Sequence, residues 1–169
     1  MKHHPFVAMC AVASLMTAAC SKSDRPATAQ APSAAPSAAP AQSPPKSTDP
    51  CTFLTETDLE SAVGYVFAAG KPTEGEPSCT FEATNGGSVT VAIPTASVSD
   101  AEFNSWKQMA GADAEPVSGI GDAAYFWNSR LYIRSGTRTA TISVADIDVT
   151  PEIKAGLRKL GETAASRLR

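Results

Sequence analysis

The hydrophobic residues of the chain fall into two stretches, separated by a region that has almost none. Residues 5–19 form an uncharged, largely apolar run, and residues 21–50 contain no aromatic residue, Leu, Ile or Val. Hydrophobic residues return in periodic patterns from residue 51 to residue 169. A segment of this length is expected to fold as one domain around a single hydrophobic core.

Three segments of this domain carry the pattern of an amphipathic helix. The first covers residues 55–63 and ends at Gly64. Two pairs are candidates for its capping box, Thr57 with Glu60 and Thr55 with Asp58. The second follows Ser99 and ends at Gly111. The third begins at Pro151, a favourable first-turn residue. Its apolar stripe consists of Ile153, Leu157, Leu160, Ala164 and Leu168.

Six short runs between these helices have the composition of β-strands, and turn residues separate them. The strongest hairpin signal is Asn85-Gly86-Gly87, because its glycines permit a positive φ. The pattern predicts an α+β fold in the order helix, three strands, helix, three strands, helix, with an antiparallel sheet covered by helices on one face. The predicted strands are residues 65–67, 79–83, 89–93, 124–127, 131–134 and 139–144.

The first 20 residues indicate export and lipidation. Residues 1–19 have a short basic start and an apolar run that is too short for a membrane span of roughly 20 residues, so we expect a signal peptide that is removed. The segment from Leu15 to Cys20 resembles a bacterial lipobox, with Thr17 where Leu is preferred. We therefore expect Cys20 to be acylated and to anchor the protein in a membrane. The alternative is an ordinary cleaved signal peptide in which Cys20 is incidental.

The residues after Cys20 are expected to tether the domain to the membrane that holds the lipid anchor. Residues 20–50 hold seven prolines among Ala and Ser, a composition that favours an extended polyproline-like spacer. Fully extended at about 3.1 Å per residue, it would reach roughly 90 Å. A proline-rich ligand for another protein is the alternative. Ser21 follows the predicted lipidation site, and by resemblance to the sorting rule of enteric bacteria it favours the outer membrane, facing the periplasm or the cell surface.

Residues 51–169 contain only two cysteines, Cys51 and Cys79. In an exported domain such a pair indicates one structural disulfide, which would close a loop of about 28 residues. A redox or metal-binding pair is the alternative, although the spacing is far from C-x-x-C.

Composition argues against several classes of function. Both histidines, His3 and His4, fall in the signal peptide, so the mature chain has none. Histidine-based catalytic triads and histidine zinc sites are therefore excluded, and we expect no enzyme, no metal and no cofactor. The domain has 10 basic and 15 acidic residues, which disfavours nucleic acid as a partner. The remaining catalytic alternative is a small enzyme that uses only carboxylates such as Glu82, Glu102 or Asp122.

Two features of the domain are candidates for a binding surface. Gly119-Ile120-Gly121-Asp122 could present backbone N–H groups to an anion, or could form a tight entry into the next strand. Tyr125, Phe126 and Trp127 are consecutive, so a strand must point Tyr125 and Trp127 away from Phe126. Those two side chains would form an exposed aromatic patch, unless a helix covers them.

Three arginines recur every fourth residue, Arg130, Arg134 and Arg138, and we expect them on a solvated strand and turn.

Four motifs of the domain stand out together: Pro50-Cys51, Leu54-Thr55, Cys79-Thr80-Phe81 and the segment from Gly119 to Ala124. In this combination they resemble a family of small secreted bacterial lipoproteins, abundant in actinobacteria, that carry a domain of unknown function. The resemblance supports the lipid anchor and the disulfide and implies no activity. We expect a non-catalytic envelope lipoprotein that binds a partner protein or an apolar ligand. The alternative is a structural or stress-related envelope component without a pocket.

Overall fold

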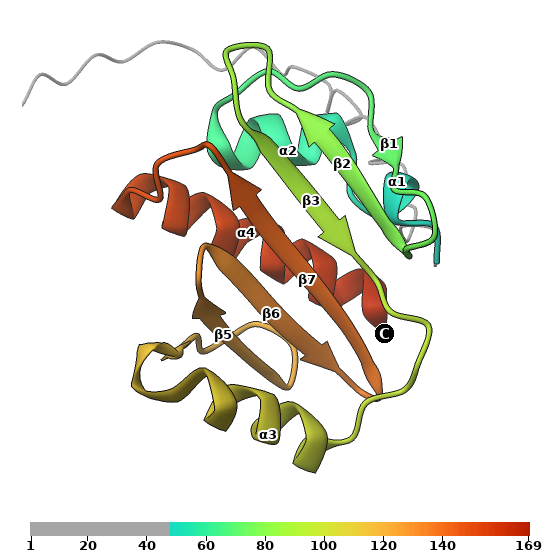
Figure 1. Cartoon of the computed structure of the whole chain (residues 1–169), viewed down its shortest axis with the longest axis vertical. Coiled ribbons are helices and arrows are strands. Elements are labelled where there is room, and N and C mark those ends of the chain that lie inside the picture. The colour runs from blue at the N-terminus through green and yellow to red at the C-terminus, as the bar shows by residue number, and fades with distance from the viewer. Residues whose placement is uncertain (1–47) are drawn as a thin grey trace, which may run out of the picture. The chain divides into compact units, whose positions relative to one another are not determined.

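A seven-stranded antiparallel sheet organises residues 48–169, the part of the chain that the computed structural model describes (Figure 1). The strand order is β1-β2-β3-β7-β6-β5-β4, so pairing of β3 with β7 joins the two halves of the domain. The strands are β1 (Lys71–Pro72), β2 (Ser78–Glu82), β3 (Ser88–Ala92), β4 (Glu115–Pro116), β5 (Ala123–Trp127), β6 (Arg130–Ser135) and β7 (Arg138–Ala145).

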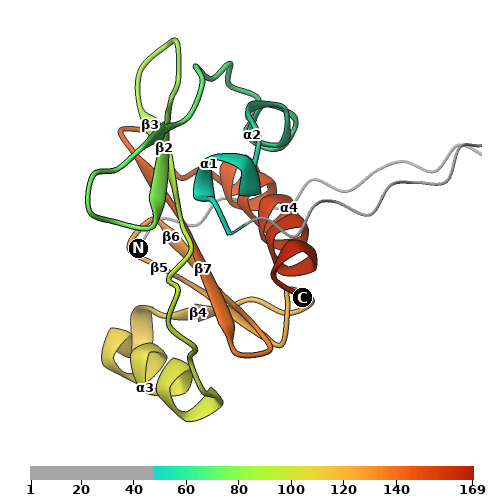
Figure 2. The ribbon, with the colours of Figure 1, turned by 90° about the vertical axis from the view of Figure 1, so that its right-hand side faces the viewer.

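Three helices lie on one face of the sheet and one lies on the other (Figure 2). The first face carries α1 (Pro50–Phe53), α2 (Glu56–Val63) and α4 (Pro151–Leu168). The second face carries α3 (Asp100–Ala110), which continues into a short 3-10 helix, Gly111–Asp113. No helix within residues 48–169 combines the length and hydrophobicity needed to cross a bilayer.

The predicted α+β class and the alternation of helices with strands are confirmed. The single helical layer applies to α1, α2 and α4 only. The reason is the alternation in β5, where Phe126 points to the α4 side and Tyr125 to the opposite side. Because both faces of β5 are apolar, the second face also needs a cover, and α3 supplies it.

Two predicted boundaries differ at the edges of the sheet. Residues 65–67 form no regular strand and contribute only a bridge between Phe67 and Ala83. Phe67 is 6% exposed and belongs to the main core, whereas Val66 is 60% exposed. The edge strands are instead the two-residue strands β1 and β4, and short edges of this kind limit pairing with other chains.

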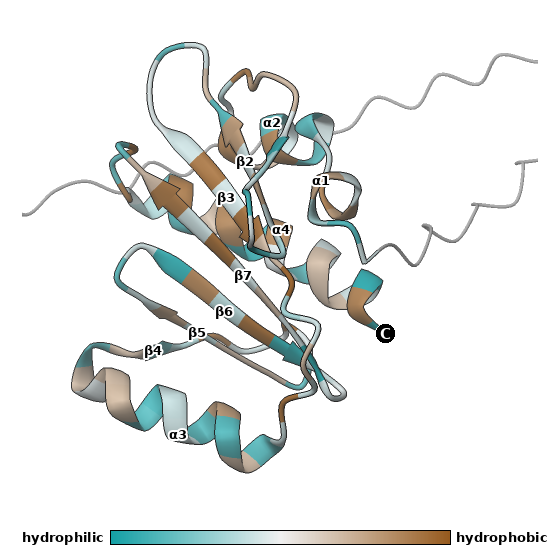
Figure 3. Cartoon of the chain, turned by 45° about the vertical axis from the view of Figure 1, so that its right-hand side comes forward, coloured by the Kyte–Doolittle hydropathy of each residue, from teal (hydrophilic) through white to brown (hydrophobic). Residues whose placement is uncertain are grey.

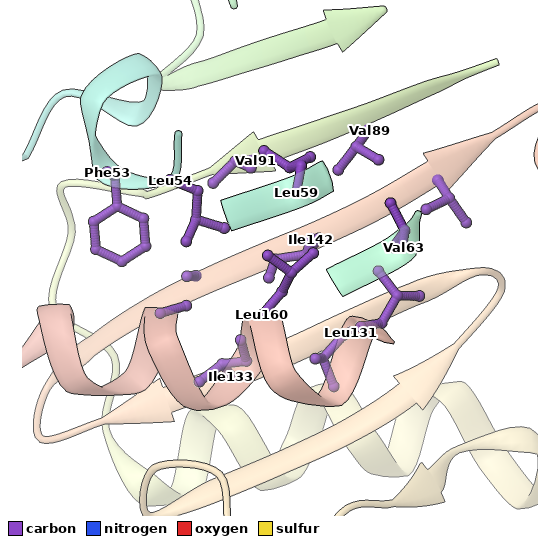
Figure 4. Packing of buried hydrophobic residues seen from close by; sticks show 14 of the residues in the cluster. Phe53, Leu54, Leu59, Val63, Val89, Val91, Leu131, Ile133, Ile142 and Leu160 are labelled. Atoms are coloured by element: carbon purple, nitrogen blue, oxygen red, sulfur yellow. The ribbon is translucent and has the colours of Figure 1, made fainter. Parts of the chain in front are cut away.

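The main core lies between the sheet and the layer of α1, α2 and α4. Figure 4 shows Leu160 of α4 against side chains of the central strands, with Leu59 and Val63 of α2 beside them. The apolar stripe predicted for α4 is buried in full: Ile153, Leu157, Leu160, Ala164 and Leu168 are each at most 7% exposed. The central strands alternate in hydropathy (Figure 3). The buried apolar positions of β3 and β7 belong to this core.

The predicted disulfide joins Cys51 of α1 to Cys79 of β2, with 5.1 Å between the two Cα atoms. This bond ties the start of the domain to the sheet. The predicted signal peptide, Cys20 and the predicted spacer up to residue 47 lie outside the described residues. The end of the predicted spacer belongs to the domain, because Pro50 begins α1 and Asp49 caps it.

An ion pair fixes the end of α4 to the start of α2. The guanidinium of Arg167 donates to both carboxylate oxygens of Asp58, at 2.7 and 3.2 Å, and also to the carbonyl oxygen of Phe53. Burial by itself raises the pKa of Asp58, but hydrogen bonds from Arg167 and Thr55 outweigh it, so the net pKa is lowered. Of the two capping pairs that the sequence suggested, Thr55 and Asp58 form the capping box.

Candidate functional site

An aromatic cluster fills the contact between α3 and the strands β5 and β6. Phe103 of α3 packs on Tyr125 with 5.3 Å between ring centroids, and Tyr125 stacks on Tyr132 at 4.8 Å. The ring centroids of Trp127 and Tyr132 are 6.3 Å apart, and the two rings are tilted relative to each other. Tyr125 and Trp127 share a face because they are two residues apart in β5, and Tyr132 joins them because β6 pairs it with Tyr125.

A cavity of about 230 Å³, here called the aromatic cavity, lies beside this cluster. Trp106 and Met109 form its exposed side, being 36% and 75% exposed. Apolar cavities of about 150 Å³ accept a benzene-sized molecule, so this one has room for an aromatic ring or a short aliphatic chain. Its lining consists of Trp106, Met109, Ala110, Tyr125, Trp127 and Tyr132.

The aromatic patch expected from the sequence is therefore partly covered. Tyr125 is 1% exposed and forms the floor, whereas Trp127 is half-buried. Burial first, and then the neighbouring Tyr132, raises the pKa of Tyr125 to about 12, so this phenol stays neutral over the physiological range. The sequence offered two alternatives, an exposed aromatic patch or a patch covered by a helix. The structure shows parts of both, because α3 covers the patch and leaves the aromatic cavity beside it.

The same face of the sheet continues beyond α3 as a polar trough of about 610 Å³. Alternation along the strands places hydroxyl side chains here, opposite the apolar side chains of the core. The pairing register places these hydroxyl residues, together with other residues of the same face, in two rows that cross five strands. The first row is Thr80, Thr90, Ser143, Arg130 and Trp127. The second row is Ser78, Ala92, Thr141, Tyr132 and Tyr125.

The hydroxyls along the trough include one hydrogen-bonded pair and one buried hydroxyl without a partner. Thr80 and Thr90 share a hydrogen bond of 2.9 Å. The Ser78 hydroxyl is buried and has no hydrogen-bond partner within residues 48–169. Buried polar groups are seldom left unpaired, so this hydroxyl is a candidate contact for a ligand that occupies the trough.

The charged residues that line the trough are Glu76 and Arg130. Arg130 follows the β5–β6 turn, in which Asn128 and Ser129 have φ values of +47° and +59°. The carbonyl oxygen of Ser129 accepts a hydrogen bond of 3.1 Å from the backbone N–H of Val144, which holds this turn against β7. Arg130 is solvent-exposed, as the sequence suggested.

Arg134 contradicts the expectation of a solvated strand, since it is only 8% exposed. It lies on the face that α3 covers, and its guanidinium forms an ion pair with Asp100 in the first turn of α3. The same group donates to the carbonyl oxygen of Gly136 at 2.6 Å. Arg134 thereby anchors α3 to the sheet, a role that period-four spacing alone could not reveal.

The glycine loop before β5 has internal roles. The carboxylate of Asp122 accepts a hydrogen bond of 2.7 Å from the backbone N–H of Gly136 and lies 3.8 Å from the Arg134 guanidinium. Gly121 has φ of +57°, and a Cβ at this position would lie 2.3 Å from the carbonyl oxygen of Arg134. Gly119, at φ +84°, has no such neighbour. These contacts favour the tight entry into a strand, and none of the three residues lines the aromatic cavity or the trough.

The carboxylates considered for catalysis occupy separate structural positions. Glu82 forms an ion pair of 2.9 Å with Lys71. Glu102 closes the capping box of α3, where the backbone N–H and then the hydroxyl of Ser99 lower its pKa. Neither these two nor Asp122 line the aromatic cavity or the trough. Within the described part of the chain, no group of three or more acidic, Cys or His side chains could hold a metal ion.

Comparison with known families gives one match. The sequence profile of the family described as "Protein of unknown function (DUF3558)" matches residues 15–141. The chain belongs to this family. The matched segment begins in the lipobox-like run and includes both domain cysteines, the aromatic cavity and most of the trough. The expected membership of a family of unknown function is confirmed. No curated protein and no solved structure was found to match the chain.

Proposed function

We propose that the chain is a lipid-anchored protein of the bacterial cell envelope whose domain binds a small apolar ligand without catalysing a reaction. The observation that carries the proposal is the aromatic cavity, where four aromatic side chains and Met109 surround space for one ring or short chain. Ligand sites are commonly concave and apolar with a few polar groups nearby, and the trough supplies those polar groups.

The anchor rests on the lipobox-like segment that ends at Cys20. Two or more acyl chains give stable attachment, because each buried CH₂ contributes about 0.8 kcal/mol. The spacer between Cys20 and α1 would hold the domain away from the bilayer, within reach of ligands in the periplasm. Ser21 favours the outer membrane.

The anchor predicts a specific mass for the mature protein. Purified from bacterial membranes, the intact protein should begin at Cys20 and carry acyl chains. A Cys20→Ala variant should lack this added mass and appear in the soluble fraction. Mass spectrometry of both proteins checks the prediction. If the mass of the wild-type protein shows no acyl chains, the anchor prediction is wrong and the domain is a free secreted protein.

Ligand binding can be followed by tryptophan fluorescence, because the two tryptophans of the chain, Trp106 and Trp127, both line the aromatic cavity. Titration with 4-phenylbutanol, a neutral probe with one ring, should change the intensity or wavelength of emission and should saturate. An Ala110→Leu variant should weaken binding about tenfold or more, because the added carbons occupy the space that the ring needs.

The matched control is Ala101→Leu, which adds the same side chain at an exposed position of the same helix. This variant should bind the probe as the wild type does. An unsaturable signal in the wild type, or equal binding by Ala110→Leu and the wild type, would refute the proposed binding site.

A further inference from the structure

The aromatic cavity and the polar trough meet at Tyr132, which lines both. Arg130 is two residues away on β6 and therefore points to the same face. At about 3.4 Å per residue, their Cα atoms are about 7 Å apart. One small ligand can thus place a ring in the aromatic cavity and a polar group beside Arg130.

The surroundings of Arg130 leave its guanidinium available. Its direct neighbours in the pairing register are Trp127 and Ser143, neither of which is acidic. Within residues 48–169 it forms no ion pair, whereas Lys71, Arg134, Lys154 and Arg167 each do. The acidic residue of the trough, Glu76, precedes β2 at the opposite side. Three strand spacings separate β2 from β6, which is about 14 Å.

We infer that the ligand is an amphipathic carboxylic acid, with an aryl or short acyl group in the aromatic cavity and a carboxylate on Arg130. A guanidinium donates two parallel hydrogen bonds to a carboxylate, and such charge-assisted bonds are stronger than neutral ones. The trough provides one arginine and no second basic side chain, which suits a single negative charge better than a phosphate dianion. The unpaired hydroxyl of Ser78 marks the trough as a place for further polar contacts. This inference rests on the proposed function and adds the chemistry of the ligand to it.

The test uses three probes that differ only in the head group: 4-phenylbutyrate, 4-phenylbutanol and 4-phenylbutylamine. Tryptophan fluorescence at neutral pH measures the affinity of the mature protein for each. The acid should bind about tenfold more tightly than the alcohol, the gain typical of a hydrogen bond to a charged group, and the amine should bind most weakly.

An Arg130→Gln variant should lose this tenfold preference for the acid and keep the affinity for the alcohol. Arg138→Gln is the matched control, because it removes the same charge from the neighbouring strand. The pairing of Arg138 with Ser135 places it on the face opposite Arg130, so it should keep the preference.

Two failures would have different meanings. If the alcohol binds as tightly as the acid, or if both arginine variants behave alike, the carboxylate inference is wrong while the apolar site stands. If none of the three probes gives a saturable change, the proposed function fails as well.

Discussion

Replacement of both Cys51 and Cys79 by alanine is expected to lower the free energy of unfolding by about 3.5 kcal/mol. The bond closes a loop with a sequence separation of 28 residues. A crosslink over this length lowers the entropy of the unfolded chain, which corresponds to about 3.5 kcal/mol at room temperature. Alanine is preferred to serine because Cys79 is fully buried, and a serine hydroxyl would lose its water without a partner. Urea unfolding of the mature protein measures the difference.

The matched control for this pair is Ser78→Ala, in the strand position next to Cys79. Its hydroxyl is buried and unpaired, so its removal should not lower the free energy of unfolding and should raise it by about 1 kcal/mol or more. Reduction of the wild type should reproduce the loss seen in the cysteine variant. A loss below about 1 kcal/mol would contradict loop closure as the source of stability, since the unfolded chain would then gain little freedom.

Structural features that depend on residues close together in the sequence were predictable. The capping box at Thr55 and the helix start at Ser99 are formed where the sequence predicts them, because the side chain and the backbone group that it bonds are three residues apart. The apolar stripe of α4 repeats with the helical period, so its buried face could be assigned before its partners were known. The prediction of a strand at 65–67 was wrong because this run pairs beside the end of β2 at one bridge only, and composition does not determine how far such pairing extends.

The candidate site was predictable only in part. The alternation of Tyr125, Phe126 and Trp127 identified the aromatic residues, but whether a helix covers them depends on tertiary packing. The trough exists because β3 pairs with β7, which brings Thr90 opposite Ser143 across more than 50 residues of chain. Alternation predicts that such hydroxyls face away from the core, but only the register shows that they form rows ending at Trp127 and Tyr125.

A Gly156→Ala substitution in α4 is expected to destabilise the domain by about 2–3 kcal/mol, although the same change in an exposed helix usually stabilises it by about 1 kcal/mol. Gly156 is where α4 contacts the end of α2. A Cβ at this position would lie 2.1 Å from the carbonyl oxygen of Ala62 and 2.8 Å from its carbon. Because both are backbone atoms, relief requires α2 to move away from the core.

Gly161→Ala in the same helix is the graded control. Its Cβ would meet the ends of two side chains, Leu131 and Ile120, at 2.7 and 2.9 Å, and these can rotate. Its cost should therefore be smaller than that of Gly156→Ala in the same urea unfolding experiment. If Gly156→Ala equals or exceeds the wild type in stability, the close contact between α2 and α4 is not a constraint.

Binding by the Gly156→Ala variant tests whether the packing of α2 on α4 affects the aromatic cavity. α2 and α4 lie on the face of the sheet opposite α3, so the substitution should leave the aromatic cavity unchanged while the protein remains folded (Figure 2). Affinity for 4-phenylbutyrate, measured by tryptophan fluorescence well below the unfolding transition, should match that of the wild type. A loss of affinity in the folded variant would mean that the two faces are coupled through the sheet, since no residue of α2 or α4 lines the aromatic cavity.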